Sequence, residues 1–582
     1  MKNLFSPCFI LLFFLAHFSV SQNNIISTNP LAEQIMLGNY NPATFLPPVI
    51  INHPDTLSRR INLEISADSL KSYIVKLSTF RNRNTGADTT SNITGIGASR
   101  RWVYSKFEEF SAANNNRLIP SYLQFDLNIC NVPRHRNIFA VLPGSDTTDK
   151  SIIIIEGHID SRCEGVCDIN CNAQGIEDNA SGTALVMEMA RVMSRFSFKH
   201  TLVFLVTIGE EQGLYGADAF ADYTVAKNIK VKAVQNNDVI GGIICGQTSS
   251  PPSCPGLNNV DSTQVRLFSF GSFNSKQKSY CRFIKLQYKE QLLTQVSVPM
   301  QITIMSAEDR TGRSGDHVPF RQKGYAAMRF TSANEHGDAG VSNPNYTDRQ
   351  HTTRDTLGVD TDNDLVVDSF FVDFNYLKRN AIINGNAAAM CAIGPKQPDF
   401  ILSAAGQNRF AVTVTQQTQY LQYRVGVRTT SHDWDTVFTM TGTLTDTFNF
   451  SSPNNIVYVS IMSVDQNNIE SVPSTEYLLN ISSVPEYNPA LLKGITLLQN
   501  HPNPFDESTY IAFLAGSEFV NKPAFITIRD LSGKLIRKIP VDISPGLNEI
   551  LYEHGYGVTG IYIYSLEVNG ETLGSRKMTF AN

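Results

Sequence analysis

Two apolar runs that each end in ionisable residues constrain the fold of this 582-residue chain more than any other feature. Ile152–Ile155 leads into His158 and Asp160, and Leu202–Val206 leads into Glu210–Glu211. Short apolar runs of this kind are typical of buried strands, and open α/β sheets bind ligands beyond the carboxyl ends of their strands. We therefore expect these polar residues to gather in one crevice of an α/β sheet.

The types of these residues suit zinc chemistry. Imidazole nitrogen and carboxylate oxygen bind catalytic zinc, and a carboxylate has two oxygens, so one Asp can bridge two ions. Asp178, which opens the next helical segment, adds a further carboxylate. In the Glu210–Glu211 pair, one residue can bind metal while its neighbour takes a proton from water. Each residue alone is more often structural, but their joint placement at strand ends predicts a catalytic metal site.

Five motifs in order resemble those of the zinc aminopeptidases with two cocatalytic metals, the family that includes bacterial leucyl aminopeptidases. They are G-H-I-D-S (157–161), E-D-N-A-S-G (177–182), G-E-E-Q-G-L-Y-G (209–216), N-N-D-V-I-G (236–241) and H-T-T-R-D-T (351–356). The segment Ser314–Phe320 also resembles the family's S-D-H-x-P-F, with Gly315 inserted. The match covers about residues 66–395 and implies a zinc-exopeptidase fold.

The resemblance implies two Zn²⁺ ions and assigns protein ligands to each of them. One ion would be held by His158, Asp178 and Asp238. The other would be held by Asp178, Glu211 and His351, so that Asp178 bridges the two ions. The implied activity is an aminopeptidase that removes N-terminal residues from peptide or protein substrates.

The resemblance also implies roles beside the ligands. Glu210 would be the general base that takes a proton from water held between the two ions and passes it to the departing amine. Asp160 lies two residues from His158, on the same strand face, and would accept the second N–H of its ring. His336 competes with His351 as the last ligand, and the H-T-x-x-D-T context favours His351.

The remaining histidines have weaker contexts. Asp316 and His317 are expected either to line the substrate cleft or to brace it. The histidines without a motif are predicted to be surface residues, and they are His135, His200, His432, His501 and His554.

Three other functions stay open. Glutaminyl cyclases share this fold but use a single zinc, whereas the presence of both His158 and Asp238 argues for two metals and hydrolysis. Carboxypeptidases of the same fold family are a further alternative. A non-catalytic surface binding protein would lack ligands, whereas this chain has all five ligands and the base.

The N-terminus is typical of an exported protein. Residues 1–21 are predicted to be a signal peptide, because Lys2 precedes an apolar core that ends in small residues. Residues 22–65 are polar and contain prolines, and we expect a lead-in or pro-segment that packs loosely on the next domain. Eight cysteines remain after Cys8, and an even number favours disulfides in an exported protein.

The cysteine positions predict disulfides near the expected site. Cys163, Cys167 and Cys171 recur every four residues, and disulfides that staple this loop are favoured over a thiolate metal site. Cys245 and Cys254 flank a Pro-containing turn and are candidates to close a short loop.

The chain changes character after the predicted peptidase domain at 66–395. Residues 396–484 contain short alternating strands without helices, which predict an all-β sandwich that resembles a fibronectin type III module. A linker at 485–493 comes next, and residues 494–582 form a second predicted all-β sandwich. The predicted fold is therefore a mostly parallel, covered α/β sheet followed by two all-β sandwich domains.

The last domain resembles the C-terminal sorting domain of the type IX secretion system. The matching motifs are L-Q-N-H-P-N-P-F (498–505), D-L-S-G-K (530–534), G-I-Y-I-Y (560–564) and R-K-M (576–578). The resemblance implies contact with the type IX secretion machinery and attachment to surface lipopolysaccharide. It places the protein outside a Gram-negative cell, secreted or on the outer-membrane surface. The net charge of −5 gives no reason to expect a nucleic-acid partner.

Overall fold

The computed structural model describes most of the chain between residues 22 and 581. The described ranges are 22–245, 258–310, 313–334, 349–362, 364, 366–452, 455–481, 494–500, 503–505, 508–554 and 558–581. The predicted signal peptide, the linker at 485–493, and residues Cys254, His336 and His501 lie outside them.

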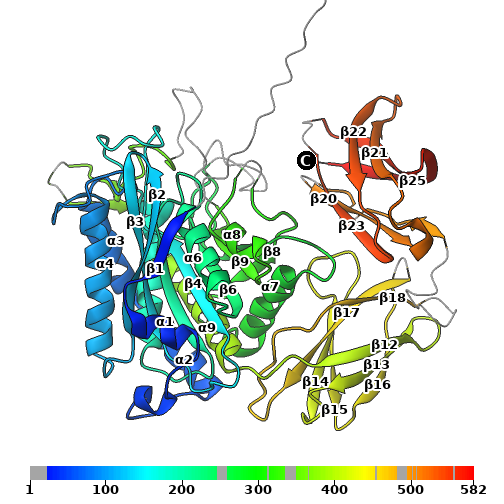
Figure 1. Cartoon of the computed structure of the whole chain (residues 1–582), viewed down its shortest axis with the longest axis horizontal. Helices are drawn as coiled ribbons and strands as arrows, with labels where there is room; N and C mark the ends of the chain where they lie inside the picture. The colour runs from blue at the N-terminus through cyan, green and yellow to red at the C-terminus, as the bar shows by residue number, and fades with distance from the viewer. Residues whose placement is uncertain are drawn as a thin grey trace, which may run out of the picture.

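A mixed sheet forms the centre of the peptidase domain, with strand order β1-β2-β3-β5-β4-β6-β9-β7-β8 (Figure 1). Its strands are β1 (Asn23–Ser27), β2 (Ile119–Ile129), β3 (Val132–Leu142), β4 (Ile152–His158), β5 (Thr201–Thr207), β6 (Val231–Asn237), β7 (Gln264–Phe268), β8 (Gln301–Ile304) and β9 (Ala327–Ser332). The central strands β5, β4, β6 and β9 pair in parallel, whereas β1, β2 and β3 pair in antiparallel order. The predicted α/β class is confirmed, with a parallel centre inside a mixed sheet.

Helices cover both faces of this sheet. They are α1 (Pro30–Met36), α2 (Pro54–Glu64), α3 (Ala67–Ser78), α4 (Gly95–Ala112), α5 (Ser181–Met193), α6 (Tyr215–Ala226), α7 (Lys276–Gln287), α8 (His317–Gln322) and α9 (Phe374–Ile393). Helices α5 and α9 pack against each other and against β4 on one face, and α6 and α8 pack together on the other. Every residue of β4 and β5 is consequently buried, which explains their continuous apolar sequences.

The segment at 22–65 belongs to this core, and the prediction that it packs loosely is wrong. Strand β1 pairs with β2 in the main sheet, and α2 packs on α9. Ala32 and Met36 in α1, and Leu57 and Ile61 in α2, are completely buried. The polar composition of this segment concealed these few apolar contacts, which are spaced along two short helices.

Two all-β units come after the peptidase domain, as predicted from the alternating pattern (Figure 1). The first contains β12 (Asp399–Ala404), β13 (Arg409–Gln416), β14 (Gln422–Arg428), β15 (Thr436–Thr441), β16 (Thr445–Asn449), β17 (Ile456–Val464) and β18 (Tyr477–Asn480). The second contains β19 (Ile495–Leu497), β20 (Ser508–Ala515), β21 (Ala524–Asp530), β22 (Leu535–Val541), β23 (Gly546–Glu553), β24 (Gly560–Val568) and β25 (Glu571–Phe580). Each unit folds as a pair of three- and four-stranded sheets.

The first β-unit is packed firmly on the peptidase domain. Ile469 and Val472, from its β17–β18 connection, join the apolar core of the peptidase domain. Glu476 forms buried ion pairs with Arg428 in its own unit and with Arg282 in α7. The two parts therefore bury a common apolar and ionic interface.

Among the described helices, none combines the length and the apolar character that crossing a membrane requires.

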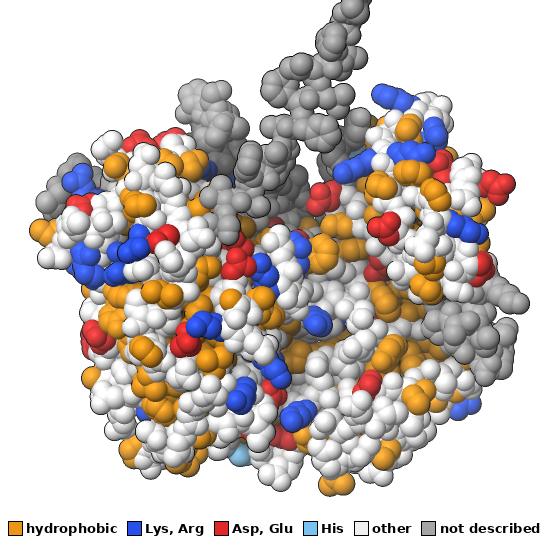
Figure 2. Space-filling view, viewed as in Figure 1, with side chains coloured by type: hydrophobic (Ala, Val, Ile, Leu, Met, Phe, Trp, Pro, Cys, Tyr) orange, Lys and Arg blue, Asp and Glu red, His pale blue; other side chains and the backbone are white. Residues whose placement is uncertain are grey.

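The described surface carries a mixed population of side chains. On the face shown in Figure 2, basic, acidic and apolar side chains are interspersed over both the peptidase domain and the β-units. No single sign of charge dominates this face, which agrees with the small net charge of −5.

Four histidines predicted to lie on the surface are buried instead. His135, His200, His432 and His554 are each at most 8% exposed. His135 Nε2 lies 2.8 Å from the Val132 carbonyl, His200 Nε2 lies 3.0 Å from Lys232 Nζ, and His554 Nδ1 lies 2.7 Å from the Tyr552 hydroxyl. Burial of this kind comes from the fold and leaves no short sequence motif.

Candidate metal centre

Three neighbouring parallel strands bring their carboxyl ends to one edge of the sheet. Strand β4 ends at His158, β5 leads into Glu210 and Glu211, and β6 leads into Asp238. Because β4 lies between β5 and β6, the side chains at the ends of these strands converge above β4.

Two further residues reach this edge from other segments. Asp178 lies in the helical turn η2 (Ile176–Ala180), immediately before α5. His351 lies in the connection between β9 and β10 (Gly358–Val359) and has positive φ. The five residues predicted as metal ligands, together with Glu210, thus come from five segments that are distant in sequence.

The first cluster surrounds His158. Its Nε2 atom lies 3.3 Å from Asp178 Oδ1, 3.4 Å from Asp238 Oδ1 and 4.0 Å from Glu210 Oε2. The imidazole is completely buried, and the carboxylates are nearly so. This is a compact set of nitrogen and oxygen donors with the dimensions of a single cation site.

The second cluster surrounds His351. Its Nε2 atom lies 3.1 Å from Asp178 Oδ2 and 3.2 Å from Glu211 Oε2. Asp178 therefore presents one oxygen to each imidazole. Glu210 lies beside the first cluster, whereas its neighbour Glu211 faces the second.

The donor atoms of these clusters fit a divalent cation. His158 Nε2, Asp238 Oδ1 and Glu211 Oε1 are buried and have no hydrogen-bond partner within the described part of the protein. Buried polar atoms are normally paired, because leaving one unpaired costs about 1–3 kcal/mol. Metal coordination is the partner that accepts an imidazole nitrogen and several carboxylates together.

The crowding of acidic groups perturbs the pKa values of these residues. Burial raises the pKa of Glu210 well above its usual range, against the opposing effect of His158. Burial also acts to lower the pKa of His158, but Glu210 and the surrounding carboxylates raise it well above normal. The pKa of Asp178 is held well below its usual range, because its contacts with His158 and His351 outweigh its burial. Such opposed shifts are typical of catalytic sites.

Asp160 braces the Glu210–Glu211 turn. Its carboxylate accepts hydrogen bonds from the backbone N–H groups of Glu210 (3.4 Å) and Glu211 (3.2 Å) and from the Thr85 hydroxyl (3.2 Å). His158 Nδ1 lies 3.5 Å from this carboxylate and 3.1 Å from the Asp160 carbonyl oxygen. Asp160 thus links the ends of β4 and β5. The predicted contact with the second ring nitrogen of His158 is made by both the carboxylate and the backbone carbonyl of Asp160.

Two supporting residues escaped the sequence-based prediction. Asp355 accepts the backbone N–H groups of Glu177 and Asp178, both at 3.0 Å, and so fixes the turn that carries Asp178. Its place in the H-T-T-R-D-T motif was the available signal. Arg329, in β9, lies 3.1 Å from Asp238 and 2.7 Å from Asp309, and no local pattern marks it.

Asp316 and His317 are completely buried. Asp316 accepts a 2.5 Å hydrogen bond from the Thr207 hydroxyl, which also contacts Glu156 in β4. His317 Nε2 contacts the Glu308 carbonyl at 3.2 Å. Of the two predicted roles, the contacts favour bracing the site over lining the substrate cleft.

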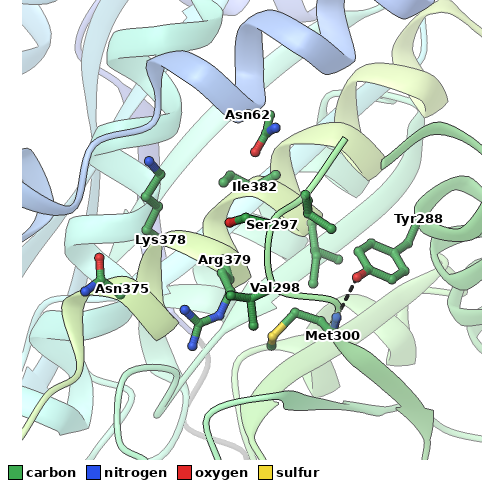
Figure 3. Close-up of a pocket in the computed structure, with 11 residues that line it drawn as sticks. Asn62, Tyr288, Ser297, Val298, Met300, Asn375, Lys378, Arg379 and Ile382 are labelled. Carbon is green, nitrogen blue, oxygen red and sulfur yellow. Dashed lines mark hydrogen bonds between the residues drawn. The ribbon is translucent and has the colours of Figure 1, made fainter. Parts of the chain in front are cut away.

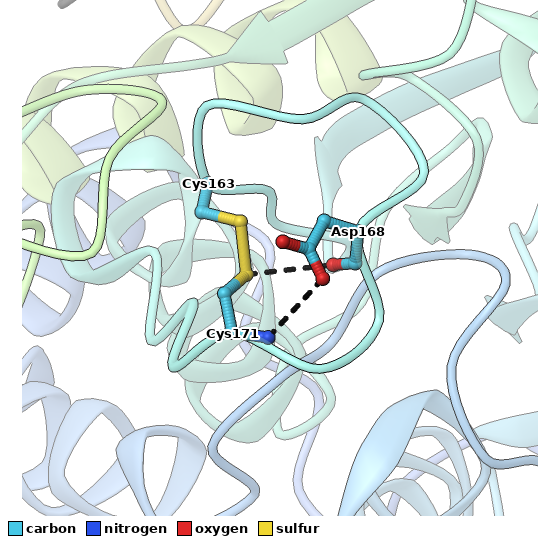
Figure 4. Close-up of side chains that lie close together, drawn as sticks. All are labelled: Cys163, Asp168 and Cys171. Atoms are coloured by element: carbon cyan, nitrogen blue, oxygen red, sulfur yellow. Dashed lines mark hydrogen bonds between the residues drawn. A yellow bond between two sulfur atoms is a disulfide. The ribbon is translucent and has the colours of Figure 1, made fainter.

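The cysteine-rich loop beside the site is closed by disulfides, as predicted. Cys163 pairs with Cys171, and Cys130 pairs with Cys167. Figure 4 shows the first disulfide beside Asp168, whose carboxylate accepts the Cys171 N–H at 3.3 Å. Sulfur atoms in a disulfide are not thiolate ligands, so this group does not form a metal site.

The other described cysteines differ in state. Cys245 is disulfide-bonded, and its predicted partner Cys254 lies outside the described residues. Cys281 and Cys391 are free thiols buried in the peptidase core.

Solved structures with related architecture include enzymes of two kinds. The LapA aminopeptidase of Legionella pneumophila is 17% identical and has a TM-score of 0.42, over 60% of this chain and 78% of that chain. The glutaminyl cyclase of Porphyromonas gingivalis is 16% identical and has a TM-score of 0.37, over 56% and 98%. At these TM-scores the two likenesses do not distinguish between the activities.

Sequence relatives and a family match are more informative. Residues 137–249 match Peptidase family M28. A probable zinc metalloprotease of Leptosphaeria maculans is 30% identical over 333 residues, which cover 55% of this chain and 73% of the relative. Another from Pyrenophora teres f. teres is 28% identical over 396 residues, which cover 65% and 78%. The matched segment contains the ends of β4, β5 and β6 and the turn that carries Asp178, whereas His351 lies beyond it. The chain therefore belongs to peptidase family M28, as a zinc-dependent peptidase.

Proposed function

We propose that this protein is an exported aminopeptidase that uses two zinc ions. The observation that carries the proposal is the pair of donor clusters that meet at Asp178, whose two oxygens face His158 and His351 at 3.3 and 3.1 Å. One ion would be held by His158, Asp178 and Asp238. The other would be held by Asp178, Glu211 and His351.

Two ions held in this way would supply Lewis-acid activation to an attacking water and to a peptide carbonyl. Glu210 lies beside the first cluster without being needed to complete either ligand set, so it is the residue to move the proton. Its carboxylate would accept the proton from the attacking water and then deliver it to the nitrogen of the departing amine. Asp160 would hold Glu210 in place through the backbone N–H contact at 3.4 Å.

Two complete clusters favour hydrolysis over cyclisation. A cyclase with one zinc needs only one of the two ligand sets, whereas this chain keeps His158 and Asp238 beside Glu211 and His351. The preference for amino termini rests on the resemblance of the motifs to those of two-metal aminopeptidases.

The activity test uses matched peptides with free or acetylated N-termini, and protein with and without chelator. We expect release of the first residue from the free peptide alone, loss of activity on chelation and recovery with zinc. Release of ammonia from an N-terminal Gln peptide without cleavage would favour the cyclase. Release of residues from the other end would favour a carboxypeptidase.

Export is proposed from the predicted signal peptide, the predicted sorting domain and the disulfides. The Cys130–Cys167 and Cys163–Cys171 bonds suit an oxidising compartment. In the last domain, the predicted sorting motifs touch each other: the Tyr564 hydroxyl donates to the Leu498 carbonyl at 2.6 Å, and Gln499 Nε2 donates to the Lys577 carbonyl at 2.7 Å. These contacts support a sorting domain read by the type IX secretion machinery, with lipopolysaccharide as the proposed surface anchor.

The export proposal is tested in a Gram-negative host that has type IX secretion. The intact chain should reach the cell surface or the medium, and a chain that ends before residue 494 should accumulate in the periplasm. Equal surface display of both chains would contradict a sorting role for this domain.

The fibronectin type III-like unit is proposed to act as a fixed support, because it shares buried contacts with the peptidase domain.

A further inference from the structure

A cavity of about 380 Å³ lies apart from the metal centre and shares no residue with either donor cluster. It lies between α2, the turn η3 (Tyr288–Leu292), the segment before β8 and the first half of α9. Figure 3 shows the Lys378 and Arg379 side chains leaving α9 in different directions, with Val298 and Met300 among the other lining residues. A cavity of this volume is large enough for a small organic ligand.

The polar side of the cavity carries two positive charges and no negative one. Lys378 and Arg379 line it, and none of its lining residues is Asp or Glu. Lys378 is partly buried and forms no ion pair or hydrogen bond with the described residues. The Arg379 Nη2 atom donates to the Ser262 carbonyl at 2.7 Å, but its buried Nε has no partner in the described part of the chain. A buried donor such as this N–H is costly to leave unpaired, and the partly buried positive charges beside it favour an anion in the cavity.

Another side of the cavity is apolar. Met300, Ile382 and Ile383 are at most 6% exposed, and they form the inner wall. Val298 is 38% exposed and lies at the rim. The cavity thus joins an apolar wall to a cationic edge, which is the arrangement that a ligand with an apolar tail and an anionic head would match.

We infer that this cavity binds a small amphipathic carboxylate, such as a short fatty acid. Its head group would accept a charge-assisted hydrogen bond from the Lys378 ammonium, and the neighbouring Arg379 would add positive charge to the same edge of the cavity. Its tail would lie against Met300 and Ile382 and remove further apolar surface from water. This inference goes beyond the proposed peptidase activity, because the cavity is separate from the metal ligands.

The test is calorimetric titration of the zinc-loaded full-length protein with octanoate, octanol and acetate. Octanoate has both features, octanol lacks the charge and acetate lacks the tail. We expect saturable octanoate binding that is at least about tenfold tighter than binding of either analogue, since a charge-assisted hydrogen bond contributes about that factor or more. Equal affinity for octanoate and octanol would overturn the assignment of an anionic head group, and absence of saturable octanoate binding would overturn the site.

Two pairs of variants locate the binding. Lys378→Met should weaken octanoate binding by about tenfold or more, while Lys230→Met, at an exposed lysine outside the cavity, should leave it unchanged. Val298→Asp should abolish binding by placing a negative charge at the rim, while Val225→Asp, at an exposed position in α6, should not. Peptidase activity and melting temperature should stay at parental values in all four. Octanoate binding that survives both Lys378→Met and Val298→Asp would place the ligand elsewhere and refute the inference.

Discussion

Replacing Glu476 with Gln should loosen the junction between the peptidase domain and the first β-unit. Arg428 donates to both carboxylate oxygens, at 2.7 and 2.6 Å, and Arg282 lies 3.4 Å away in α7. All three side chains are completely buried. A glutamine keeps the shape of the side chain but leaves two buried guanidinium groups without a countercharge.

Two routes give the size of the effect. Removing one partner from a buried ion pair costs about 3–5 kcal/mol. Independently, Arg428 and Arg282 overcome the effect of burial and lower the pKa of Glu476 from 4.5 to about 2. At about 1.4 kcal/mol for each tenfold change in proton affinity, that lowering corresponds to about 3 kcal/mol. Burial lowers the pKa of Arg282 to about 10, so it remains charged at neutral pH and the pair stays intact.

The direction of the pH dependence comes from the lowered pKa. A carboxylate that is more acidic in the folded protein stabilises it fully above its unfolded pKa and loses this contribution as the pH falls. The stability difference between parent and Glu476→Gln should therefore be full above pH 4.5 and shrink as the pH approaches 2.

Urea unfolding followed by tryptophan fluorescence measures this difference. Trp434 is a suitable reporter, because its ring lies 6.0 Å from the Arg282 guanidinium, and a Trp102→Phe background removes the other tryptophan. Glu567→Gln is the control, since its partly exposed pair with Lys538 should contribute less than about 1 kcal/mol. The reasoning is refuted if Glu476→Gln unfolds at the parental urea concentration at pH 7, or if the difference persists unchanged below pH 4.5.

Three further predictions concern the site and its support. Glu210→Gln should keep two zinc ions but lower kcat by about 10²–10⁴-fold, whereas the control Glu164→Gln, on the exposed loop, should keep the parental kcat. Loss of zinc from Glu210→Gln, measured by elemental analysis, would show that Glu210 is a ligand. Arg329→Met should destabilise the protein by about 3–5 kcal/mol and weaken zinc binding in chelator competition, because Asp238 loses its countercharge. An unchanged melting temperature and zinc affinity would show that Arg329 does not support Asp238. Breaking the Cys130–Cys167 disulfide by serine substitution should lower stability by about 2–4 kcal/mol, since it closes a loop with a sequence separation of 37; an unchanged melting temperature would show that the loop is held by other contacts.

The elements that carry the site were predictable because their signals are local. The apolar runs of β4 and β5 lead directly into His158 and Glu210, and a parallel sheet places neighbouring strand ends side by side. Motif context also favoured His351 as a ligand, and its Nε2 atom lies 3.2 Å from Glu211.

The features that were missed depend on contacts between distant segments. Strand β1 gains its place only by pairing with β2, which lies far along the chain, so the sequence around it resembles a loose leader. Arg329 belongs to no motif, because its function arises from Asp238 and Asp309 on neighbouring segments. The buried histidines were misjudged for the same reason, since burial is decided by tertiary packing.

Zinc content per chain tests the central claim most directly. Purified protein, loaded with excess zinc and then desalted, would be analysed by elemental mass spectrometry together with His351→Ala. The two clusters that share Asp178 predict two zinc ions per parental chain and one in the variant, with the ion beside His158 retained. One zinc ion per parental chain, with no loss in His351→Ala, would contradict the two-metal site and leave a single-zinc enzyme.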